Sequence, residues 1–140
     1  MTIPVWVLLG FAGWTVVHLL TTIGVYRWSR ILTGRTEIRQ FRADYVEGED
    51  WYRRAVRAHA NCIENLPVYG AVVVGVVVTG ATGPLLDALA IVLMIARVCQ
   101  TMVHVAFKET NAMVWIRFGF FSVQLACMFW MGAMVVLKAL

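Results

Sequence analysis

Four long apolar stretches limit this 140-residue chain to very few folds. They cover residues 3–28, 57–80, 85–107 and 113–140, and each matches the roughly 20 residues that a helix needs to cross the hydrocarbon core of a membrane. A small soluble domain could not bury a chain that is 61% hydrophobic, because small domains hide the least of their surface. Lipid cannot satisfy an open sheet edge, which favours helices. We therefore predict a single all-α domain over residues 1–140, an integral membrane four-helix bundle.

The connections between these stretches differ in length and charge. Residues 80–84 and 108–111 form short turns, and the first has the glycines and proline typical of a turn that precedes a helix. The first connection, residues 29–54, is long and carries six arginines and five acidic residues. The positive-inside rule predicts that the first and third connections are cytoplasmic and that both termini lie outside. Six of the twelve Lys and Arg residues of the chain lie in this connection, and no stacking platform or basic groove indicates nucleic-acid binding.

Polar residues enter the second stretch at helical spacing. Arg57, Asn61 and Glu64 follow an i, i+4, i+7 pattern, which places them on one helix face. An arginine near a helix end can reach the headgroups, but Glu64 lies about two turns further in. A carboxylate inside the membrane costs several kcal/mol unless it is paired or faces water. Glu64 is therefore a candidate for function or for an ion pair.

The third and fourth stretches carry a second set of polar residues. Arg97, Gln100 and His104 share a face of the third helix, and Arg117 lies near the start of the fourth. Arg97 is deep in its helix and needs a partner, for which Glu64 is the obvious candidate. Because the helices are antiparallel, these residues reach a similar depth near the first and third connections. The sequence thus predicts a cationic pocket in the cytoplasmic leaflet.

Two further patterns are weaker signals. His18 in the first stretch is explained by a hydrogen bond between packed helices. His59, His104 and Glu64 do not have a recognised metal-ligand spacing, so we predict no metal site.

An arginine-rich pocket suits a small anion, and it can favour a bound thiolate over a thiol, since a nearby cation lowers the pKa of a thiol. The three cysteines lie in apolar stretches, which indicates a nucleophile supplied by a thiol cosubstrate.

The polar residues of the second, third and fourth stretches resemble those of the MAPEG family. This family comprises the membrane-associated proteins in eicosanoid and glutathione metabolism and includes the microsomal glutathione transferases. The similarity lies in Arg57-x-x-x-Asn61-x-x-Glu64 followed by Pro67, with Arg97 and Arg117 on the next two helices. It extends over essentially the whole chain. The resemblance implies a homotrimer in which glutathione, as cosubstrate, binds between neighbouring protomers in the cytoplasmic leaflet.

The resemblance also implies roles for individual residues. Arg117 matches the arginine that stabilises the thiolate and is the candidate catalytic residue. The candidate glutathione-binding residues are Arg57, Asn61, Glu64, Arg97, Gln100 and His104, together with an arginine of the first connection, either Arg30, Arg35 or Arg39, of which we favour Arg39. Ala60 and Phe118 depart from the pattern of some members, which puts eicosanoid chemistry in doubt.

The leading functional hypothesis is a membrane-bound glutathione transferase or peroxidase that directs a thiolate at a lipophilic electrophile or hydroperoxide. The expected partners are the lipid bilayer, a hydrophobic small molecule and further copies of the chain. The alternative is a non-catalytic family member that binds a lipophilic ligand or a partner protein. A transporter or proton relay built on Glu64 and His104 forms a third class, but short turns leave little room for alternating access. The short termini fit a bacterial inner-membrane protein.

Overall fold

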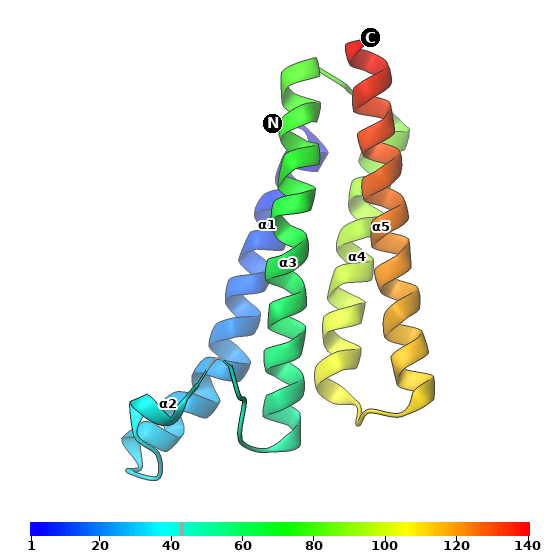
Figure 1. Cartoon of the computed structure of the whole chain (residues 1–140). Coiled ribbons are helices and arrows are strands. Elements are labelled where there is room, and N and C mark those ends of the chain that lie inside the picture. The colour runs from blue at the N-terminus through cyan, green and yellow to red at the C-terminus, as the bar shows by residue number, and fades with distance from the viewer. Residues whose placement is uncertain (43) are drawn as a thin grey trace.

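The computed structural model describes residues 1–42 and 44–140 and consists of four long helices that run antiparallel to their neighbours in sequence (Figure 1). The first is built from three consecutive helical segments: α1 (Ile3–His18), the π-helix η1 (Leu19–Gly24) and α2 (Val25–Leu32). The others are α3 (Asp50–Thr79), α4 (Pro84–Ala106) and α5 (Asn111–Ala139). A short 3₁₀-helix, η2 (Ile38–Gln40), lies in the first connection, and no strand occurs in the described ranges.

All four helices are long and apolar enough to cross a membrane. They contain 30, 30, 23 and 29 residues, which at 1.5 Å per residue exceeds the thickness of a hydrocarbon core. The predicted all-α bundle is therefore present. Both termini lie at one end of the bundle, and the first connection and the α4–α5 turn lie together at the other (Figure 1). We call this second end the connection end.

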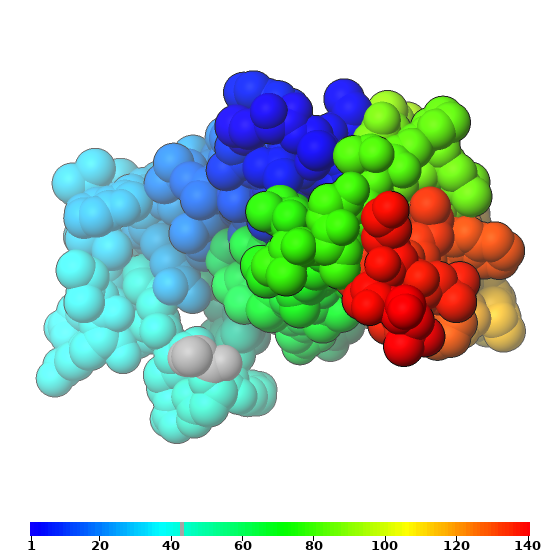
Figure 2. Space-filling model, turned by 90° about the horizontal axis from the view of Figure 1, so that it is seen from above, coloured from blue at the N-terminus to red at the C-terminus, as the bar shows by residue number. Residues whose placement is uncertain are grey.

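Two helix boundaries differ from those predicted. The first helix continues to Leu32 rather than ending at residue 28, and α3 begins at Asp50 rather than at residue 57. The reason is a second apolar cluster at the connection end, in which Tyr52 and Ala55 pack against Ile23 and Tyr26. These contacts stabilise helix beyond the apolar stretches, so the connection shortens to residues 33–49. Figure 2 shows that this connection spreads to one side of the bundle.

The helix ends follow from local sequence. Gly80 ends α3 with a left-handed backbone, φ 64°, which glycine adopts without steric cost. Pro84 begins α4, where its missing N–H has no helical partner to lose. The Thr110 side chain caps α5 by accepting a hydrogen bond of 3.3 Å from the backbone N–H of Met113.

The π-helix η1 corrects the phase of the first helix. The buried positions of the first helix are Pro4, Phe11, Thr15 and His18 before η1, Ile23 within it, and Tyr26 after it. Ile23 follows His18 by five residues. In an α-helix of 3.6 residues per turn, Ile23 would therefore point away from the face that packs against the other helices. The wider turn of a π-helix absorbs the additional residue. One continuous face of the first helix thereby packs along α3.

The main core lies between the four helices on the side of the termini. It contains Phe11, Tyr69, Leu86, Leu93 and Met131, each at most 1% exposed. α3 and α5 approach each other closely at Gly75, where an added Cβ would lie 2.8 Å from Cγ1 of Val135. The three cysteines are free, with Cys62 and Cys127 buried in this core.

Candidate functional site

The predicted site residues lie on three helices at the connection end. Arg57, Asn61 and Glu64 belong to α3, Arg97, Gln100 and His104 to α4, and Arg117 to α5. We call Arg57, Arg97 and Arg117 the arginine cluster. The structure divides the cluster between two levels, an outer one at the end of the bundle and an inner one further along the helices.

At the outer level, a carboxylate that was not predicted joins two of the arginines. Glu109, in the turn between α4 and α5, accepts a hydrogen bond of 3.1 Å at Oε2 from Nη1 of Arg57. Its Oε1 accepts one of 3.0 Å from Nη2 of Arg117. The hydrogen bond from Arg117 is the main reason why the pKa of Glu109 lies below its usual range. Glu109 is therefore ionised at neutral pH and bridges α3 and α5.

Two buried glutamines hold Arg117 in place. Gln100 donates a hydrogen bond of 3.3 Å from Nε2 to the backbone carbonyl of Arg117. Gln124 in turn donates from Nε2 to Oε1 of Gln100 at 3.0 Å and to the carbonyl of Phe120 at 2.9 Å. Both amides are almost inaccessible, at 3% and 0% exposure. Because buried polar groups are costly when unpaired, this chain of hydrogen bonds fixes the position of α5 at Arg117 against α4.

At the inner level, Arg97 lies almost completely buried, with 1% of its surface exposed. Its Nη1 donates a hydrogen bond of 3.2 Å to Oδ1 of Asn61, which also accepts one of 2.8 Å from Asn65. The guanidinium lies over the ring of Phe11, 5.0 Å from its centroid. Its Nε and Nη2 are buried and have no hydrogen-bond partner in the described part of the chain.

The predicted pairing of Arg97 with Glu64 is wrong within one chain. Glu64 is exposed, and the described residues give it no ion pair. The physical reason is rotation about the axis of α3. Asn61 is turned toward α4, whereas Glu64, three residues later, points to the outside of the bundle. A carboxylate thus faces outward from the middle of a membrane-length helix.

His104 and the arginine of the first connection take different positions. His104 is half-buried on α4, near enough to Arg117 and Glu109 for their charges to act on it. Arg39 is 83% exposed and pairs with Glu37 at 2.5 Å, so the structure does not bring it to the arginine cluster of its own chain.

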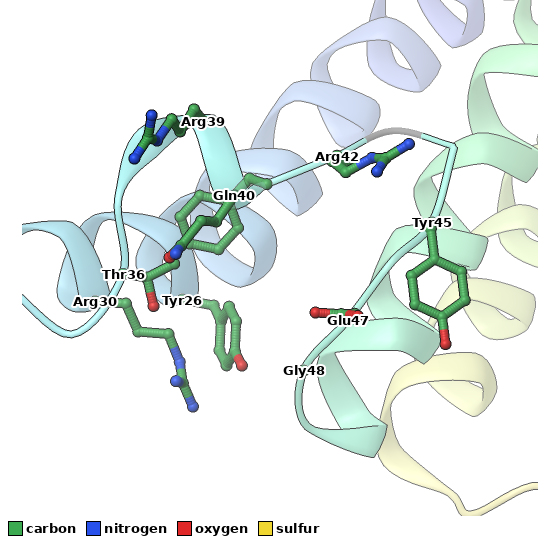
Figure 3. A pocket seen from close by; sticks show the side chains of 10 residues that line it. Tyr26, Arg30, Thr36, Arg39, Gln40, Arg42, Tyr45, Glu47 and Gly48 are labelled. Carbon is green, nitrogen blue, oxygen red and sulfur yellow. The ribbon is translucent and has the colours of Figure 1, made fainter.

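Arg39 instead lines an open cavity of about 700 Å³ in the first connection (Figure 3). Arg30 lines the same cavity, with its guanidinium 4.6 Å from the centroid of the Tyr26 ring, while Arg35 is exposed. Figure 3 shows Arg39 on η2 at one side of the cavity and Arg30 at another. The structure therefore leaves the choice among these arginines open.

Two residues of the site were not among the predicted site residues. Glu109 was not predicted because it lies in a turn. Gln124 lies on the same side of the fourth helix as Arg117 in the sequence pattern, but as a single amide in an apolar helix it was given no role in the site. The position of Glu109 at the connection end was a usable signal, since the turn lies beside Arg57 and Arg117. The prediction for His18 is confirmed: its Nε2 lies 3.1 Å from the carbonyl of Ala55, a hydrogen bond between the first helix and α3.

The helix order and the polar residues can now be set beside known proteins. The family model of MAPEG matches residues 4–137, nearly the whole chain. The chain belongs to the MAPEG family. Neither the curated proteins nor the solved structures give a match. Membership in MAPEG, together with the four apolar helices, makes the chain an integral, multi-pass membrane protein of a family concerned with eicosanoid and glutathione metabolism.

MAPEG membership confirms the predicted resemblance and the predicted four-helix membrane fold. The roles of the site residues stay predictions. What the geometry adds is a buried Arg117 on a helix held by Gln100, an exposed Arg57 nearby, and a second buried arginine below them. Such an arrangement can bind an anion and stabilise negative charge that develops beside Arg117.

Proposed function

We propose that this MAPEG protein is a membrane-bound glutathione transferase, or a peroxidase of the same type, that attacks lipophilic electrophiles. The observation that carries the proposal is the position of Arg117. Its side chain is only 9% exposed, and its one ion-pair partner in the described chain, Glu109, comes from a half-exposed turn. A buried guanidinium whose ion-pair partner is half-exposed is well placed to stabilise an incoming anion.

In the proposed reaction, Arg117 stabilises glutathione as the thiolate, because a neighbouring positive charge favours the ionised thiol. The proton passes to water. With an aryl halide, the sulfur forms a bond to the ring carbon and the halide leaves with its electron pair, so the product is the thioether. Arg57, Asn61, Glu64 and Arg97 would position the peptide, with Gln100, His104 and Arg39 as further candidates.

The outward-facing Glu64 supports the proposal that the protein works as a homotrimer. A carboxylate facing hydrocarbon is too costly to persist, so a second copy would have to cover it. Arg57, two turns before Glu64 and also exposed, would lie under the same neighbouring protomer. The glutathione site would then lie between protomers, in the leaflet of the connection end, which we propose is cytoplasmic.

The electrophile would arrive through the membrane. An apolar groove of about 560 Å³ lies between α3 and α5, lined by Val68, Val72, Leu125, Ala126, Met128 and Phe129. Val68 lies one helical turn beyond Glu64, so the groove continues from the polar face of α3 toward the middle of the bilayer. A lipophilic substrate in this groove could approach the thiolate without crossing water.

The test uses purified full-length protein in detergent, with glutathione and an aryl halide. We expect glutathione binding, an ultraviolet absorbance change from thiolate formation, and conjugation. Arg117→Ala should lose about 10²–10³-fold in turnover, the usual effect of removing one donor that stabilises developing charge. Arg117→Lys, which keeps the charge without the planar fork, should retain part of the activity. A wild-type protein that neither binds glutathione nor conjugates would refute the proposal.

The second candidate is a non-catalytic MAPEG protein that binds a lipophilic ligand, which the apolar groove between α3 and α5 favours. Such a protein would still assemble and bind lipophilic molecules, but the addition of glutathione would produce no thiolate absorbance. The same spectroscopic measurement therefore separates the two functions.

A further inference from the structure

At the outer level of the site, the two arginines Arg57 and Arg117 share the carboxylate of Glu109. Arg57 and Arg117 each bind a different oxygen of the same carboxylate, at 3.1 and 3.0 Å. The gap between their guanidinium groups is therefore the width of one carboxylate. That gap is filled by Glu109, which belongs to neither helix that carries the arginines.

The two ends of the bridge differ in how firmly they are held. Arg117 is 9% exposed and lies on α5 where Gln100 holds its backbone carbonyl. Glu109 is 48% exposed and lies in a turn between two helix ends, next to an Arg57 side chain that is 66% exposed. Ion pairs as exposed as Arg57–Glu109 contribute little to stability. Glu109 is thus the partner that can leave, and Arg117 is the one that stays.

There is also space beside the bridge. A cavity of about 230 Å³ is lined by Arg53, Arg54, Arg57, Asp50 and Glu109 itself. Arg54 is already engaged, since it pairs with Asp50 and donates a hydrogen bond of 3.2 Å to the carbonyl of Val105. Arg53 pairs with Asp50 as well, at 3.7 Å. An anion in this cavity therefore has Arg57 as the lining arginine that Asp50 does not hold, with Glu109 beside it.

We propose that Glu109 is an internal occupant of the anion site, held between Arg57 and Arg117 until the carboxylate or thiolate of a ligand replaces it. The inference rests on the proposed anion-binding role of these two arginines. Its consequence is a competition: the ligand binds only the fraction of molecules in which Glu109 has left, so the apparent dissociation constant is raised by that fraction. Glu109 thereby lowers the affinity of the site for every competing anion by the same factor.

The test begins without glutathione. Phenylglyoxal modifies accessible arginines, and mass spectrometry of the full-length protein in detergent gives the rate at Arg57 and at Arg117. Glu109→Gln keeps the shape of the side chain but removes its charge. We expect modification of both arginines to become about threefold faster or more, and inorganic sulfate to protect them at about threefold lower concentration, because the competitor is gone. Rates and protection equal to those of the wild type would overturn the proposal.

The matched control is Asp44→Asn. Asp44 forms the corresponding exposed ion pair with Arg42, at 2.5 Å, in the first connection. This variant should accelerate modification of Arg42 and leave Arg57 and Arg117 unchanged. If Glu109→Gln does not yield folded protein, Glu109→Asp replaces it. The shorter carboxylate cannot span both arginines, so modification should rise at one of them, and wild-type rates at both would again overturn the proposal.

Glutathione is added last, so that the two proposals can fail separately. If the wild type binds it, Glu109→Gln should lower the dissociation constant by the same factor as for sulfate, and an unchanged constant would overturn the role of Glu109. If neither protein binds glutathione while modification and sulfate protection change as expected, the glutathione function is rejected and the internal occupant is supported.

Discussion

Arg97 brings a positive charge into the interior of the bundle with no carboxylate beside it. Its contacts are one hydrogen bond to Asn61 and the face of Phe11, while two of its nitrogens are unpartnered in the described chain. A buried charge with so few partners costs free energy that the fold recovers elsewhere. The hydrogen bond to Asn61 is therefore what allows the fold to keep the buried charge of Arg97.

Removal of Asn61 should therefore expose this cost. We expect Asn61→Ala to lower the free energy of unfolding by about 1–3 kcal/mol, because the Arg97 guanidinium loses its hydrogen-bond acceptor. Arg97→Met, which removes the charge but keeps an apolar chain of similar length, should cost less or even stabilise the protein. Denaturation in detergent, followed by circular dichroism, measures both.

The double variant decides whether the two residues act together. In the Arg97→Met background, Asn61→Ala should cost much less than it does alone. An equal cost in both backgrounds would mean that Asn61 stabilises the fold through Asn65 or the backbone instead.

Among the helices, the contact between α3 and α5 is the one most sensitive to a single added carbon. Gly75 allows the approach, and an added Cβ would lie 2.8 Å from Cγ1 of Val135, a short side chain with little freedom to move. In membranes, small residues at helix contacts permit the close backbone packing that holds helices together.

We expect Gly75→Ala to destabilise the bundle by about 1–3 kcal/mol through overpacking. Val135→Ala should restore most of that loss when combined with it, because it removes the atom that clashes. The measurement is the thermal midpoint in detergent for the two single variants and the double one. A Gly75→Ala protein as stable as the wild type would show that α5 shifts freely at this contact.

The sequence predicts the four helices and the end at which the polar residues gather, because length and hydropathy determine spans and antiparallel order determines depth. It does not predict rotation about each helix axis. The inference for Arg97 therefore named Glu64, whereas the contact is Asn61, about one turn earlier on α3 and turned toward α4. The start of α3 at Asp50 was missed for a related reason: Tyr52 and Ala55 are stabilised by tertiary packing that no local pattern contains.

For the molecule as a whole, the outward face of α3 is the feature that a single chain cannot explain. Glu64 is exposed on it, and Val74 and Val78, nearer the other end of the helix, are 60% and 79% exposed. Apolar side chains can face lipid without cost, but the carboxylate cannot.

If neighbouring copies cover Glu64 and pair it with a cation, Glu64→Gln should weaken the assembly by about 2–5 kcal/mol, the usual effect of breaking a buried charged pair at an interface. Native mass spectrometry in detergent gives the oligomeric state. Val78→Ala, on the same helix but among lipid-facing residues, serves as the control and should leave the assembly unchanged. A trimer of undiminished stability in Glu64→Gln would argue that Glu64 faces water or headgroups.

The π-helix Leu19–Gly24 has a consequence for how this chain can change in length. Because its wider turns hold a residue more than an α-helix needs, loss of one residue there would leave an ordinary α-helix with Phe11, Thr15 and Tyr26 still on one face. The same loss within α4 or α5 would turn every buried side chain beyond it away from its partner. The first helix is thus the part of the bundle that can lose one residue and keep its packing.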